Sequence, residues 1–469
     1  MISPTVVTSF AYDEAVIHVE IYSPEEIIDQ PGTPYGVSVK RPPLLVLHGN
    51  AGSIHEFDQQ IEYFSKQRTV IAIDSRGQGK STVNPELEIT YEIMADDVLE
   101  IMNRLGVPEV HLLGFSDGAI TSLLFAKNNP FRVKTLTAIG ANIDPKGLTT
   151  QAREDIKEEI KRLKKERKQK ELKAQGILES SEYDVELSEH EFGLEPEEVL
   201  LELLMAHPHI KLSALSEIHC PTLIITGEHD MIKPEHTKQI VSQIEHAEHK
   251  VIQGADHFVL AGYSHKVNEM VEELITANEK DLKPIELSLS ENLTTEIATE
   301  ADLEEVKQVY NDMIDSLETS TNYAGWKRGV YPAVEIAEKG VKDGDLFVVR
   351  QKSDGKAVAS FILRYDLPFY FSAAGWENIE QEAVLMIHTL IVSPKAKSSG
   401  IGRHVLAFME DYARKNPQTK AIRFNTSPQN VPANYLYIRS GFIRYYAFLQ
   451  PYRGLDIPDW TNPYEKRIR

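Results

Sequence analysis

The stretch HLLGFSDGAITSL, residues 111–123, places one serine between two glycines directly after a run of apolar residues. A strand that enters a helix through a very tight turn strains the residue at the turn and leaves no room for side chains near it. Gly114 and Gly118 stand two positions before and after Ser116, which is therefore expected to project its hydroxyl into solvent. The backbone N–H of Asp117 then becomes available to a developing oxyanion. Taken alone, this pattern is equally typical of a tight turn without catalysis.

The surroundings of this turn predict the fold of the first half of the chain. Short β-prone runs alternate there with helical patterns, and we expect strands at 44–48, 69–74, 109–114, 134–140, 222–227 and 249–254. Several runs are apolar on both faces, as in a parallel sheet covered by helices. We therefore predict a doubly wound, mostly parallel α/β domain over residues 1–280. A charged helical segment interrupts the alternation at about 145–215 and is interpreted as a helical cap.

Polar residues follow several of the expected strands. Asn50 comes after the first run, Asp230 after the run at 222–227, and His257 after the last run. Because the carboxyl ends of parallel strands meet at one edge of a sheet, these side chains are expected to converge on Ser116. Asp256 is an alternative acid beside His257, but the order serine, aspartate, histidine favours Asp230.

On these residues the first half resembles the α/β-hydrolase family. The resemblance implies that Ser116 is the nucleophile, His257 the general base and Asp230 the acid that orients it. It also implies that Asn50 and Asp117 form the oxyanion hole, with an acyl-enzyme formed from a small carboxylic ester or amide. The turn resembles that of valacyclovirase-like hydrolases as well, in which the aspartate meets a substrate amino group. A generic ester and an aminoacyl ester therefore both stay open.

The second half has a different organisation. A polar segment at 281–295 is expected to be a linker, and an amphipathic helix then opens at Thr299 or Glu300. After that helix, strands are expected at LFVVR, AVASFILRY and AVLMIHTLIVSP, followed by a helix, a strand at AIRFNT and a last helix. We predict an α+β domain over residues 296–469.

The segment KSSGIGRHVL, residues 397–406, places two glycines where a helix is expected to begin near Ile401. Bare backbone N–H groups at a helix N-terminus, with the helix dipole behind them, suit a pyrophosphate. Lys397 and Arg403 add positive charge. The pattern is not a dinucleotide fingerprint, because Val405 stands where a third glycine would be.

With the later segment NVPANYLYIRSGF, residues 430–442, this half resembles the GNAT family of N-acetyltransferases. The resemblance implies acetyl-CoA as cofactor, Tyr437 as proton donor to the leaving thiolate, and Asn430 in contact with cofactor or intermediate. It implies that Leu390 and Val392 pair with the pantetheine. The pyrophosphate would be held by Lys397, Ser398, Ser399, Gly400, Ile401, Gly402 and Arg403. Lysine at 397 departs from the usual glutamine or arginine, but it can still face a phosphate.

The residue that accepts the proton of the attacking amine stays open. Glu382 and His388 lie near or on the preceding strand and are the candidates. Trp326 and Tyr331, in the segment GWKRGVYP, either shape the amine pocket or belong to the core.

Composition limits the classes of function. The chain has 469 residues and a net charge of −21, of which −19 falls on the first 280 residues, which argues against general binding to nucleic acid or anionic membrane. A single cysteine, Cys220, excludes an intrachain disulfide, and no metal site is expected. We see no secretory signal and expect a cytoplasmic protein. The interpretation is a bifunctional enzyme acting on small molecules. The alternative is that one half is inactive and serves as a binding or regulatory module, with acetyl transfer the main activity.

Overall fold

The structure is a computed structural model of the chain, and it divides into two compact units. It describes residues 2–28, 31–84, 86–174, 196–279, 283–320, 322–366, 368–396, 400–450 and 459–468. The first unit comprises Met1–Asp29, Tyr35–Ile101 and Glu109–Lys280, and the second comprises Gln30–Pro34, Met102–Pro108 and Asp281–Arg469.

The first unit is built on a twisted sheet with a parallel centre. Its strands are β1 (Val6–Tyr12), β2 (Ala15–Tyr22), β3 (Leu44–Leu47), β4 (Val70–Ile73), β5 (Thr82–Val83), β6 (Val110–Phe115), β7 (Val133–Ile139), β8 (Thr222–Gly227) and β9 (Ala247–Ile252). They lie in the order β1-β2-β4-β3-β6-β7-β8-β9, with β5 paired to β2. From β4 to β9 every neighbouring pair is parallel, so the carboxyl ends of these strands lie along one edge.

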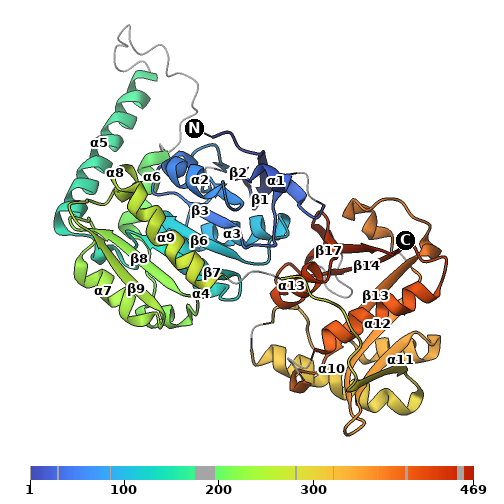
Figure 1. Ribbon diagram of the computed structural model, residues 1–469. Coiled ribbons are helices and arrows are strands. Elements are labelled where there is room, and N and C mark those ends of the chain that lie inside the picture. The colour runs from blue at the N-terminus through green and yellow to red at the C-terminus, as the bar shows by residue number, and fades with distance from the viewer. Residues whose placement is uncertain are drawn as a thin grey trace. The chain divides into compact units, whose positions relative to one another are not determined.

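Helices cover both faces of this sheet, as Figure 1 shows. They are α1 (Glu25–Ile28), α2 (Asp58–Phe64), α3 (Tyr91–Arg104), α4 (Asp117–Asn128), α5 (Thr150–Ala174), α6 (Pro196–Ala206), α7 (Pro234–Gln243), α8 (Val259–Gly262) and α9 (Ser264–Asn278). One buried cluster joins the apolar faces of α2, α8 and α9 to β3, β4, β6, β7 and β8. Burial of such residues supplies most of the stability of the unit.

All six strands expected in the first half are present, and the mostly parallel α/β fold is confirmed. The charged segment forms the long helix α5, which projects from the rest of the unit (Figure 1). The first half of α5 packs through Ala152, Ile156 and Ile160 against a small cluster that also holds Leu204 of α6, and Leu163 is buried as well. The hairpin of β1 and β2 is an addition that the sequence pattern did not predict.

The second unit is built on a mixed sheet. Its strands are β10 (Leu293–Ile297), β11 (Leu346–Gln351), β12 (Ala357–Arg364), β13 (Val384–Val392), β14 (Ala421–Thr426), β15 (Ile443–Arg444), β16 (Phe448–Gln450) and β17 (Asp459–Arg467). Their order is β10-β11-β12-β13-β14-β17-β15, with β16 paired to β17. Among the described strands of this second sheet, the one parallel pair is β13 with β14.

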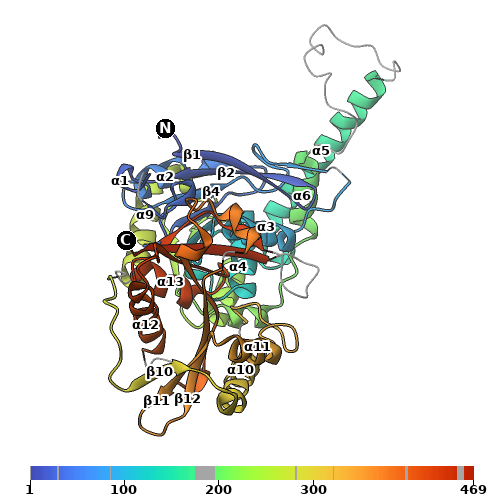
Figure 2. The ribbon, with the colours of Figure 1, turned by 90° about the vertical axis from the view of Figure 1, so that its right-hand side faces the viewer.

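Helices pack on opposite faces of this second sheet. They are α10 (Leu303–Glu318), α11 (Val334–Asp343), α12 (Ile401–Lys415) and α13 (Val431–Arg439). One cluster joins α12 and Tyr437 of α13 to the sheet, and another joins α10 and Ala337 of α11 to the other face (Figure 2). This is the predicted α+β arrangement. Within the described part of the chain, no helix combines the length and apolar character needed to cross a membrane.

Candidate active sites

The turn after β6 has the geometry that its glycines predict. Ser116 has a φ of 52°, in the left-handed region that non-glycine residues rarely adopt, and it precedes the first turn of α4. A Cβ at Gly114 would overlap Gly118 and Ser122, and a Cβ at Gly118 would overlap the Leu47 carbonyl. The close packing of strand and helix therefore holds the strained serine in place.

The three predicted triad residues form a hydrogen-bonded series with His257 in the middle. The Ser116 Oγ lies 3.0 Å from His257 Nε2, and His257 Nδ1 lies 2.8 Å from an oxygen of Asp230. The histidine and the aspartate are both shielded from solvent, since the side chains of His257 and Asp230 are 7% and 3% exposed. Asp230 also accepts hydrogen bonds from the backbone N–H groups of Gly227 and Ile232. These bonds keep the carboxylate oriented towards the imidazole.

Two further features fit the histidine into this arrangement. Gly140 directly follows β7 and has a φ of 63°, and a Cβ there would overlap the His257 ring, so a larger residue would displace the ring. On another side the ring lies against Phe115, with 5.2 Å between centroids. Asp256, the alternative acid, instead accepts a hydrogen bond from the Phe258 backbone.

The predicted oxyanion residues lie beside the serine. Asp117 begins α4, so its N–H is one of the first-turn donors that have no partner within the helix. The Asn50 side chain donates a 2.8 Å hydrogen bond to the Asp117 carboxylate and a 2.9 Å bond to the carbonyl of Leu200 in α6. Burial raises the pKa of Asp117 to about 6. The Asp117 carboxyl therefore holds Asn50, and Asn50 connects the turn to the cap.

His48 and Glu56 hold the loop that carries Asn50 through hydrogen bonds to its backbone. The Ser75 backbone N–H donates to His48 Nε2, so His48 is a neutral ring that donates through Nδ1 to the Gly49 carbonyl at 2.8 Å. Burial lowers the pKa of His48 and keeps it neutral. The Glu56 carboxylate accepts from the Gly49 N–H at 2.8 Å. These contacts pre-organise the backbone that ends at Asn50.

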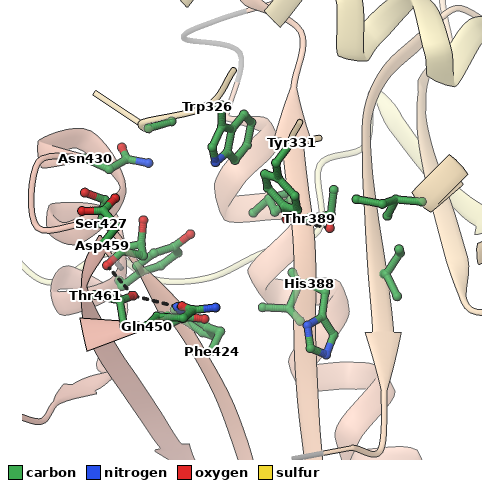
Figure 3. A pocket seen from close by; sticks show the side chains of 18 of the residues that line it. Trp326, Tyr331, His388, Thr389, Phe424, Ser427, Asn430, Gln450, Asp459 and Thr461 are labelled. Atoms are coloured by element: carbon green, nitrogen blue, oxygen red, sulfur yellow. Dashed lines mark hydrogen bonds between the residues drawn. The ribbon is translucent and has the colours of Figure 1, made fainter. Parts of the chain in front are cut away.

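The second site is a cavity of about 210 Å³ in the mixed-sheet unit. It opens between β13 and β14, which pair only from Val384 to Met386 and from Ala421 to Arg423 and then separate. The wall on the β13 side includes His388 and Thr389, and Phe424 lies on the β14 side (Figure 3). Leu390 of β13 is also a lining residue.

A bulge changes the direction of β13 at this point. The register between β12 and β13 shifts after Ser360, and Thr389 has a φ of 50°. Such a value is strained for a β-branched residue, and bulges re-aim side chains beside functional sites. The Thr389 hydroxyl lies 2.8 Å from the hydroxyl of Tyr331, which ties the bulge to the 324–331 segment.

The glycine-rich segment meets α12 as expected. Gly400 caps α12 with a φ of 76°, and the helix begins at Ile401, whose side chain is buried in the core. Gly402 packs so tightly on α13 that an added Cβ would lie 2.8 Å from a Leu436 methyl. Lys397, Ser398 and Ser399 lie outside the described residues. Gly400 to Arg403 therefore offer bare backbone and one guanidinium to an anion, which fits the pyrophosphate of an acyl-CoA.

Tyr437 and Asn430 both line the cavity. Tyr437 is 8% exposed, packs on Phe424 with 4.4 Å between centroids, and has its pKa raised to about 12 by burial. Asn430 is the N-cap of α13, where its Oδ1 accepts from the Ala433 N–H at 3.3 Å. Leu390 lines the cavity, whereas Val392 lies further along β13 and is not among the lining residues.

Of the two candidate proton acceptors, only one reaches the cavity. His388 lines it, and its Nε2 lies 2.8 Å from the Asp366 carboxylate. Glu382 lies on an exposed turn before β13 and is not among the lining residues. Trp326 and Tyr331 line the cavity and contact each other edge to face, with 5.6 Å between centroids.

Several residues around the two sites had not been singled out in the sequence. Gly140 had an available signal, since it directly follows a buried strand. Asp366, Glu56 and Asp459 had none, because each reaches its site through contacts between segments that local patterns do not encode. Among the described residues, no cluster of three or more histidine, cysteine or acidic side chains is arranged to hold a metal ion.

Comparison with known families identifies two domains in the chain. The family described as alpha/beta hydrolase fold matches residues 42–163, and the acetyltransferase (GNAT) family matches residues 311–442. The chain therefore carries an α/β-hydrolase domain followed by a GNAT acetyltransferase domain, in the order predicted. These domains support hydrolase and acetyltransferase activity on small molecules, and the GNAT domain implies use of an acyl-CoA.

Individual proteins resemble the chain at low identity. Serine hydrolase BPHL of Mus musculus is 27% identical over 239 residues, which cover 50% of this chain and 78% of that protein. A proline iminopeptidase of Lactobacillus delbrueckii subsp. bulgaricus is 24% identical over 278 residues, which cover 52% of this chain and 93% of that protein. The crystal structure of an alpha/beta hydrolase enzyme from a Medee basin deep-sea metagenome library has a TM-score of 0.46 and 20% identity, covering 58% of this chain and 99% of that one.

Proposed function

We propose that the chain is a bifunctional enzyme. Residues 1–280 act as a serine hydrolase on a small carboxylic ester or amide, and residues 296–469 act as an acetyl-CoA-dependent N-acetyltransferase. The observation that carries the first activity is the hydrogen-bonded series from Ser116 through His257 to Asp230. The observation that carries the second is the cavity between the diverging strands β13 and β14, lined by Tyr437 and His388.

In the hydrolase, His257 takes the proton of the Ser116 hydroxyl as its oxygen attacks the substrate carbonyl. Asp230 stabilises the imidazolium that forms. The backbone N–H groups of Asn50 and Asp117 stabilise the oxyanion. His257 then protonates the leaving alcohol or amine, and an acyl group remains on Ser116. Water, deprotonated by His257, releases the acid and regenerates the serine.

Covalent trapping tests this mechanism. The full chain is treated with a fluorophosphonate, digested, and analysed by peptide mass spectrometry. We expect phosphonylation of the peptide that contains Ser116 and none in Ser116→Ala. Labelling at a different residue, or no labelling while ester is still hydrolysed, would contradict the assignment.

Substitution of Asp117 tests whether its carboxyl meets the substrate. Because this carboxyl is buried and holds Asn50, we expect Asp117→Asn to lower kcat/KM about tenfold for a neutral ester and an aminoacyl ester alike. The ratio of the two kcat/KM values should not change as pH increases through about 6.

The opposite result has a defined signature. If the carboxylate binds an ammonium group, only the aminoacyl ester loses rate in Asp117→Asn. In wild type the ratio would then rise as pH increases through about 6, because the carboxyl ionises there. In Asp117→Asn it would be flat.

In the transferase, an acyl-CoA supplies the thioester from which the acetyl group is transferred. Gly400, Gly402 and Arg403 hold the pyrophosphate, and His388 takes the proton that the attacking amine releases. Asp366 orients His388 and stabilises its protonated form. Tyr437 gives its phenolic proton to the departing sulfur. The proton lost by the amine thus goes to His388, and the proton gained by the sulfur comes from Tyr437.

Removing the Tyr437 hydroxyl tests the proton donor. We expect Tyr437→Phe to lower kcat for acetyl transfer about a hundredfold with little change in the KM for acetyl-CoA. Because the pKa of Tyr437 is about 12, wild type should keep its activity as the pH is raised to about 10. CoA release, followed with a thiol reagent, measures both. Tyr446→Phe, at an exposed position, is the control. An unchanged kcat in Tyr437→Phe would exclude the role.

A further inference from the structure

The transferase cavity contains a carboxylate that the chemistry above does not use. Asp459, the first residue of β17, lines the cavity together with Thr461 (Figure 3). Trp460, between them, is also a lining residue. Its only described hydrogen bond comes from the backbone of Trp460. No described lysine, arginine or histidine side chain forms an ion pair with it.

The other charged groups of the cavity are already compensated. Arg364 lines the wall, but its guanidinium pairs with Asp345 and Asp343. His388 pairs with Asp366. Asp459 is therefore the one lining carboxylate, among the described residues, that is left without a cation. Burial raises the pKa of Asp459, which means that its charged form lacks the solvation it would have in water.

The surroundings of Asp459 suit a protonated amine. Trp326 and Tyr331 present aromatic surface to the same cavity. Aromatic faces attract ammonium groups most strongly where water is excluded. Figure 3 shows Asp459 and His388 on opposite sides of the cavity. An ammonium bound at Asp459 would therefore not be the nitrogen that gives its proton to His388.

We propose that Asp459 binds a second, protonated amino group of the acceptor, so that the substrate class of the transferase is a diamine acetylated at the end nearer His388. This inference rests on the proposed transferase function. The reacting amine must be neutral to attack, and a carboxylate beside it would favour its protonated form. Placing the carboxylate on the far wall avoids that conflict and selects for a molecule with a second cation.

The test compares three acceptors of one chain length: cadaverine, pentylamine and the corresponding amino alcohol. Acetylation by the full chain is measured at saturating acetyl-CoA in wild type, Asp459→Asn and the control Asp411→Asn, which removes an exposed carboxylate of α12. We expect wild type to have the lowest KM for cadaverine. Asp459→Asn should raise that KM by roughly ten- to a hundredfold, with kcat and both other KM values nearly unchanged.

A second measurement does not depend on turnover. Cadaverine is titrated into the full chain with CoA present while tryptophan fluorescence is followed, because Trp326 and Trp460 line the cavity. We expect saturable binding that Asp459→Asn weakens and Asp459→Glu partly restores. Removing an unpaired, desolvated charge should leave the thermal stability of Asp459→Asn at or above that of wild type, so a folding defect is not expected.

Each other outcome overturns a different statement. Equal KM values for the three acceptors in wild type would exclude diamine selection while leaving acetyl transfer intact. A uniform loss of kcat for all three in Asp459→Asn would make Asp459 a proton acceptor or a structural residue instead. Acetylation of no amine by wild type would contradict the transferase function itself, and the inference with it.

Discussion

Ester hydrolysis by Ser116→Ala is expected to fall by at least about 10⁴-fold in kcat, because the substitution removes the oxygen that is acylated in the proposed mechanism. The Oγ is held 3.0 Å from His257 Nε2, and no other hydroxyl is described within hydrogen-bond distance of that nitrogen. The measurement is initial-rate hydrolysis of p-nitrophenyl acetate. Residual activity should reflect only the oxyanion hole and substrate binding.

The transferase activity of the same protein is the internal control. Acetyl transfer to an amine by Ser116→Ala should equal that of wild type, since the serine belongs to the other domain. Ser216→Ala, which removes an exposed hydroxyl outside the site, controls for serine substitution in the hydrolase. Full esterase activity in Ser116→Ala would mean that another group is the nucleophile or that the first domain is a binding module.

Gly118→Ala is expected to have the largest effect on stability. A Cβ at this position would overlap the carbonyl of Leu47, and backbone in the centre of a parallel sheet cannot move aside as a flexible side chain can. We expect the first domain to lose about 3 kcal/mol of unfolding free energy. Urea titration, with remaining ester hydrolysis as the readout, measures this loss.

A matched substitution distinguishes crowding from a general effect of removing glycine. Gly262, in α8, has open space where its Cβ would lie. Gly262→Ala should therefore leave stability within about 1 kcal/mol of wild type, on either side. Equal stability of Gly118→Ala and Gly262→Ala would show that strand β3 and helix α4 are not as closely packed as the structure has them.

Much of the fold follows from local patterns, and the exceptions have physical causes. The hairpin of β1 and β2 turns through Asp13 and Glu14, both with positive φ. Two-residue hairpin turns usually contain asparagine and glycine, so the pair Asp-Glu does not predict a hairpin. Strand β17 contains Pro463, and a proline argues against a strand inside a sheet. Both elements form because pairing with neighbouring strands and packing on the core stabilise them, although the local sequence does not favour them.

The candidate sites divide in the same way. The position of each triad residue after a strand was apparent in the sequence, because carboxyl ends of parallel strands share an edge. The catalytic roles of these residues remain predictions. The pairing of His388 with Asp366 was not apparent, since it joins the bulged strand β13 to a loop 22 residues earlier.

By itself, the sequence of this protein determined the order of its two domains, the strained serine turn and the helix that begins at Ile401. These features depend on residues close together in the chain, where glycine spacing and backbone sterics leave few alternatives. Only the tertiary structure decided that Gly140 makes room for His257 and that Asp459 and Trp326 line the same cavity. Such contacts arise when segments far apart in the chain pack together, and no local periodicity encodes which of their side chains will meet.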